Sequence, residues 1–72
     1  MSSKYPLLTS ETVVNALKRG GFSPISQKGR HLKLKKGPRT AIIPLHEEVA
    51  RGTLKSILEQ AGLELDEFME LL

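Results

Sequence analysis

The hydrophobic and polar positions of the chain first follow a helical period. Between residues 9 and 19, apolar side chains recur at helical spacing at Val13, Val14 and Leu17. The residues Thr9-Ser10-Glu11 are typical of a helix N-terminus, and Gly20-Gly21 is typical of a helix end. The pattern therefore predicts a helix over residues 9–19.

From Phe22 onward the period changes to two, which indicates strands. We predict strands over residues 22–27, 30–35 and 40–44, joined by turns at Lys28-Gly29 and at residues 36–39. Pro24 confines the first strand to a sheet edge or to a bulge near its start. Short turns between successive strands predict an antiparallel meander.

The strict alternation of residues 30–35 separates two kinds of side chain. Leu32 and Leu34 should face a core formed with the helices, whereas His31, Lys33 and Lys35 should share the opposite, wetter face.

The C-terminal third returns to the helical period. After a polar connector over residues 46–52, Gly52-Thr53 should cap a second helix that ends at Gly62, and residues 65–72 form a short last helix. The predicted fold is α+β, with the order α-β-β-β-α, a three-stranded antiparallel sheet, helices on one face and a short extra C-terminal helix.

Length and composition limit the classes of function. The chain has 72 residues, which we interpret as a single domain over residues 1–72, and it contains no cysteine and no glycine-rich phosphate-binding motif. A large multi-layer enzyme, a P-loop or dinucleotide-binding fold and a thiolate metal site are thereby excluded. No apolar run approaches the length of a membrane span and no leader pattern is present, so we expect a cytoplasmic protein with no membrane partner.

The net charge of +3 combines two unlike parts. Residues 1–45 contain nine Lys or Arg residues and one acid, a charge of +8, whereas residues 46–72 contain two basic and seven acidic residues, a charge of −5. No carboxylate lies between Lys18 and Arg39. Such a segment is either a solvated basic surface or a binding site for a polyanion, of which nucleic acid is the strongest candidate.

The basic segment between Lys18 and Arg39 contains one histidine, His31. Imidazole can act as a general acid or base near neutral pH, so His31 is the candidate catalytic residue. RNA supplies its own nucleophile, the 2′-hydroxyl, and the cleaving protein needs only proton transfer and a phosphate clamp. The candidate phosphate-binding residues are Lys28, Arg30, Lys33, Lys35 and Arg39. His46 is a possible second site histidine, and the sequence offers no ligand set for a metal and implies no cofactor.

Several segments together resemble the HicA (YcfA-like) family of mRNA-interferase toxins. They are Gly20-Gly21-Phe22, Gln27–His31, Ile43–His46, Gly52–Leu63 and Glu67-Phe68. The resemblance implies a fold like that of the double-stranded RNA-binding domain. It also implies a type II toxin that cleaves mRNA without a metal and is held inactive by a HicB-type antitoxin. The essential histidine of the family maps onto His31, and its second histidine onto His46.

Arg30 departs from the family pattern, which has a small residue before the histidine. The guanidinium could bind the scissile phosphate at this position. Two alternatives stay open from the sequence: a non-catalytic RNA-binding module of the same fold, and a degenerate toxin that acts only as an antitoxin-binding protein.

Overall fold

The chain folds as a helix, three strands and two further helices. The computed structural model describes residues 5–72. Its elements are α1 (Ser10–Arg19), β1 (Ser23–Lys28), β2 (His31–Lys36), β3 (Arg39–Pro44), α2 (Arg51–Ala61) and α3 (Leu65–Met69). The predicted α+β order, with its short last helix, is confirmed. The predicted domain also includes residues 1–4, which lie outside the described residues.

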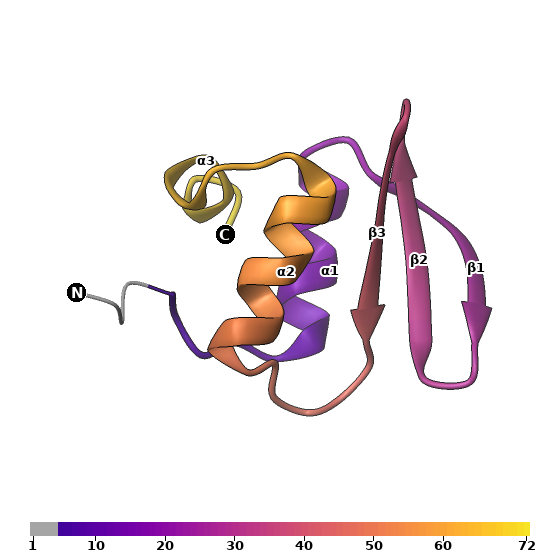
Figure 1. Ribbon diagram of the computed structural model, residues 1–72, viewed down its shortest axis with the longest axis horizontal. Helices are drawn as coiled ribbons and strands as arrows, with labels where there is room; N and C mark the ends of the chain where they lie inside the picture. The colour runs from indigo at the N-terminus through magenta and orange to yellow at the C-terminus, as the bar shows by residue number, and fades with distance from the viewer. Residues whose placement is uncertain (1–4) are drawn as a thin grey trace.

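The strands form one antiparallel sheet in the order β1-β2-β3. The helices α1 and α2 lie on one face of this sheet, and both pack against β3 (Figure 1). The opposite face carries no helix in the described part of the chain (Figure 1). The fold therefore presents one bare sheet face, as the sequence predicts.

The core lies between the sheet and the helices and is wholly apolar within residues 5–72. It contains Val13, Val14, Ala16, Leu17, Phe22, Leu34, Ala41, Ile43, Val49, Leu54, Ile57, Leu58, Ala61 and Phe68. Burying this apolar surface supplies most of the favourable free energy of folding.

The strand β1 contributes nothing to this core. All six of its residues are exposed, and in Figure 1 it lies at the edge of the sheet farthest from the helices. Its register with β2 shifts between Pro24 and Ser26, which is a β-bulge or irregularity. The expectation that Pro24 sits on an edge strand near a bulge is confirmed.

The turn between β1 and β2 is displaced by one residue from its predicted position. It consists of Gly29 and Arg30, not Lys28 and Gly29. Gly29 has a φ of 58°, which the first position of a type II′ hairpin turn requires and which glycine adopts at little cost. His31 is consequently the first residue of β2 and is paired with Lys28, the last residue of β1.

The start of α1 is confirmed and that of α2 is not. The Thr9 hydroxyl accepts a hydrogen bond of 3.2 Å from the Thr12 amide, as an N-cap should. The helix α2 begins at Arg51, before the predicted cap at Gly52-Thr53, and its N-cap Ala50 makes no side-chain bond. The predicted polar connector also contains the buried Val49, whose amide donates to the Leu8 carbonyl at 2.7 Å. Val49 is thus fixed against the core two residues before Arg51, and α2 begins earlier than the polar pattern of residues 46–52 predicts.

Candidate functional site

Strand β2 separates its side chains as the alternation predicts. Leu34 is fully buried against the helices and Leu32 is partly buried, while His31, Lys33 and Lys35 are exposed. Because successive side chains of a strand point to opposite faces, these three polar residues lie on the bare face of the sheet.

The strand register brings further residues beside His31. On one side of β2, Lys28 is paired with His31 and Ser26 with Lys33. On the other side, Ile42 is paired with Lys33. Paired residues of antiparallel strands share a face, with Cβ atoms about 4.5–5.5 Å apart. The register thus gathers residues from three strands around the histidine.

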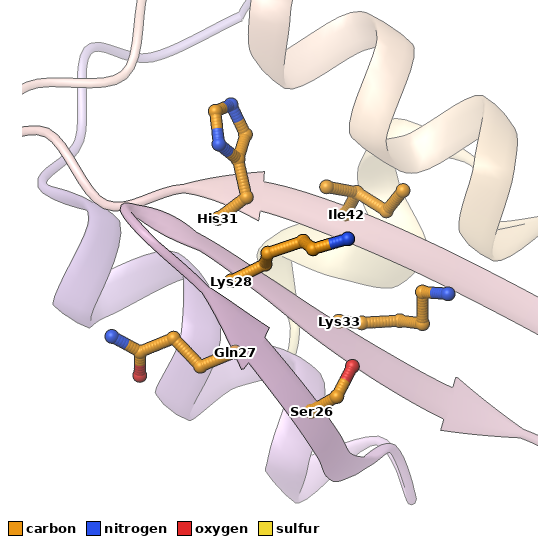
Figure 2. Close-up of a pocket in the computed structure, with 6 residues that line it drawn as sticks. All are labelled: Ser26, Gln27, Lys28, His31, Lys33 and Ile42. Atoms are coloured by element: carbon orange, nitrogen blue, oxygen red, sulfur yellow. The ribbon is translucent and has the colours of Figure 1, made fainter.

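These residues line a depression of about 640 Å³. Its lining residues are Ser26, Gln27, Lys28, His31, Lys33 and Ile42, and we call it the His31 depression. Figure 2 shows that Gln27 extends away from the other labelled side chains. Its amide Nε2 donates to the Gly29 carbonyl at 3.2 Å, so Gln27 braces the hairpin turn.

The charge of the His31 depression is positive. Two of its lining residues, Lys28 and Lys33, carry ammonium groups, and none of its lining residues is acidic. Neither lysine side chain is hydrogen-bonded to another part of residues 5–72. The depression therefore suits an anionic ligand whose charges the two lysines can reach.

Two other predicted residues flank the depression without lining it. Arg30 occupies the hairpin turn next to His31, and its carbonyl accepts a hydrogen bond of 2.6 Å from the Leu45 amide. Lys35 lies on the same face farther along β2, and its ammonium group donates to the Gly37 carbonyl at 2.5 Å. Both side chains are exposed.

Arg39 is not brought into this group. It is paired with Lys36 at the end of the sheet opposite His31. A Cβ atom on Gly62 would lie 2.6 Å from Cζ of Arg39, so the guanidinium packs against the C-terminal end of α2. The structure places Arg39 beside the helices and apart from the His31 depression.

His46 lies near His31 along the fold but outside the depression. It follows β3 by two residues, and Pro44, the last residue of β3, is paired with His31. The imidazole of His46 is exposed and does not line the depression.

Sequence reasoning missed Ser26, Gln27 and Ile42 as residues of the site. The pattern that could have identified Ile42 lies in β3, where Ile42 is flanked by Ala41 and Ile43. These neighbours are fully buried, so the alternation of a strand places Ile42 on the bare face. Its place beside Lys33 follows only from the register of the strands.

Two further features concern metals and membranes. Within residues 5–72, no three histidine, aspartate or glutamate side chains gather as a metal site would require. In the same part of the chain, none of the helices combines the length and the apolar character needed to cross a membrane.

The fold and the site define a small α+β protein with a basic, histidine-bearing sheet face. Residues 10–63, from α1 through α2, match the family model described as the HicA toxin of bacterial toxin-antitoxin. This match covers most of the chain, and the chain belongs to the HicA toxin family. A search of the curated proteins finds no match. Family membership gives the chain the role of a toxin and implies an antitoxin as its partner.

Proposed function

We propose that this toxin is an endoribonuclease that cleaves mRNA without a metal ion and uses His31 as a general acid or base. A HicB-type antitoxin is its proposed inhibitor. The observation that carries the proposal is the pairing of exposed His31 with Lys28 inside a basic depression on the bare sheet face. Membership of a toxin family supports it.

The reaction needs only groups that this site, the RNA and solvent water supply. The 2′-hydroxyl oxygen of one nucleotide bonds to the adjacent phosphorus, and the bond from phosphorus to the 5′-oxygen of the next nucleotide breaks. The 2′-hydroxyl loses a proton and the departing 5′-oxygen gains one, so the products carry a 2′,3′-cyclic phosphate and a 5′-hydroxyl. His31 takes the first proton or gives the second, and solvent water exchanges the other proton.

Lys28 and Lys33 are the proposed clamp for the reacting phosphate. Their ammonium groups lie in the His31 depression, where they can stabilise the negative charge that builds up on the phosphate oxygens. Arg30 and Lys35 are proposed to hold neighbouring phosphates, because both are exposed beside the depression. Arg39 has no part in this proposal because it packs against α2, and His46 is proposed only as a nearby RNA contact.

Cleavage of RNA in the presence of EDTA tests this function. We expect the wild-type protein to cut a single-stranded RNA, and His31→Ala to cut it at least about 100-fold more slowly, because proton transfer is lost. His46→Ala is the comparison: it removes an exposed histidine outside the depression, so it should at most weaken RNA binding and should leave proton transfer intact.

Equal cutting by the wild type and His31→Ala would contradict the assignment of His31. Binding of RNA without cutting would instead favour the non-catalytic RNA-binding module. A protein that binds only its antitoxin would be a degenerate toxin.

A further inference from the structure

One apolar residue lines the His31 depression and takes no part in the proposed proton transfer or phosphate clamp. Ile42 is 42% exposed, although isoleucine is usually buried, and it is the one aliphatic side chain among the six lining residues. In Figure 2 it rises from β3 on the same side of the sheet as Lys33.

The backbone holds Ile42 in this exposed position. Ala41 and Ile43 on either side of it are fully buried, so β3 cannot turn Ile42 inward without exposing both. In addition, the Ile42 amide donates a hydrogen bond of 2.9 Å to Oε1 of Gln60, on α2. The strand edge is thus fixed to a helix, and the isoleucine is presented on a rigid support.

We propose that Ile42 is a platform for a nucleobase, which packs its flat face on the isoleucine while Lys28 and Lys33 hold the phosphate of the same nucleotide. This subsite rests on the proposed function. The paired positions Lys33 and Ile42 are adjacent across the two strands, and a single nucleotide joins a charged phosphate to a flat, largely apolar base over a comparable span.

None of the aromatic residues in the described part of the chain is placed on the bare sheet face, where it could stack on a base. Phe22 and Phe68 are buried in the core, and Tyr5 packs partly buried against it. Proteins that bind single strands usually stack bases on aromatic rings, and Ile42 supplies the apolar surface here instead. Because isoleucine forms no hydrogen bond with a base, the subsite discriminates by base area and favours purines over pyrimidines.

Binding of a 2′-O-methyl RNA, which lacks the attacking hydroxyl and cannot be cut, tests the platform. We expect Ile42→Ala to weaken binding about 5- to 10-fold, because part of the buried apolar surface is lost. Ile42→Thr should weaken it similarly while keeping a β-branched residue in the strand, and Ile42→Val should stay within about twofold of the wild type.

The chain offers a matched control in Ile25. This isoleucine is 51% exposed on β1 and does not line the depression, so Ile25→Ala should leave RNA binding unchanged. Equal effects of Ile25→Ala and Ile42→Ala, or no effect of either, would overturn the platform and leave the proposed ribonuclease intact. A wild-type protein that binds no RNA would overturn both proposals.

Abasic nucleotides identify the base that packs on Ile42. Each position of the 2′-O-methyl RNA is replaced in turn by an abasic nucleotide, which keeps the phosphate. At one position, the abasic substitution should weaken binding to the wild type by the same factor by which Ile42→Ala weakens binding of the intact RNA. The same substitution should not weaken binding to the Ile42→Ala protein any further. If the abasic substitution and Ile42→Ala weaken binding by independent factors at every position, no base contacts Ile42.

Discussion

At the scale of single residues, two cations of the basic segment contact the ends of helices. Arg39 lies beside Gly62, the C-cap of α2, where φ is 73° and an added Cβ would meet the guanidinium. Lys36 likewise donates to the Gly20 carbonyl at 2.7 Å. Both contacts join a helix end to the sheet, and neither side chain lines the His31 depression.

Replacing Gly62 with alanine should therefore destabilise the fold. The left-handed backbone and the contact with Arg39 both oppose a side chain, and we expect Gly62→Ala to lower the free energy of unfolding by about 1–3 kcal/mol. Gly52→Ala is the control, because nothing lies within 4 Å of that position, and it should be neutral or stabilising. Urea unfolding of both variants measures the difference, and equal stability would contradict this assignment.

At the scale of elements, the β1–β2 hairpin carries five of the six residues that line the candidate site. Its strand β1 lies at the sheet edge farthest from the helices, and the whole of β1 is exposed (Figure 1). Lys28 and Lys33 lie on adjacent strands of this hairpin. The rigid sheet thus presents two cations with no carboxylate among the lining residues, and both can contact phosphates.

The salt dependence of RNA affinity measures how many phosphate contacts the protein makes. Each phosphate contact to a single strand contributes about 0.7 to the slope of log affinity against log salt. We expect the double variant Lys28→Ala/Lys33→Ala to reduce the magnitude of this slope by about 1.4. The charge-matched control Lys18→Ala/Lys55→Ala removes two exposed lysines from helices and should leave the slope unchanged. The same reduction in both double variants would mean that the cations act only through net charge.

The sequence predicted these elements well where a local period decides the structure. Alternation alone placed His31 and Lys33 on one face, because the side-chain period of a strand is two whatever its neighbours are. Register depends on the exact turn, and the turn at Gly29-Arg30 differs by one residue from the prediction. Neither the place of Ile42 in the candidate site nor the separation of Arg39 from the His31 depression could be predicted until the pairing of the strands was known.

At the scale of the whole molecule, the cations of the candidate site and the acidic last helix lie on different sides of the fold. The basic residues of the site lie on the β1–β2 hairpin, whereas α3, with its acidic first turn, lies on the helix side away from the bare sheet face (Figure 1). A ligand that approaches the bare sheet face therefore meets a more positive surface than the net charge of +3 indicates.

The decay of a reporter mRNA in bacterial cells, measured after induction of this chain alone, tests most directly whether the protein is an mRNA-cleaving toxin that works through His31. We expect the wild type to fragment the reporter and stop growth, and His31→Ala, expressed to the same level, to leave both mRNA half-life and growth unchanged. If the His31→Ala protein shortens the half-life as much as the wild type does, or if neither protein affects it, the proposed function is wrong.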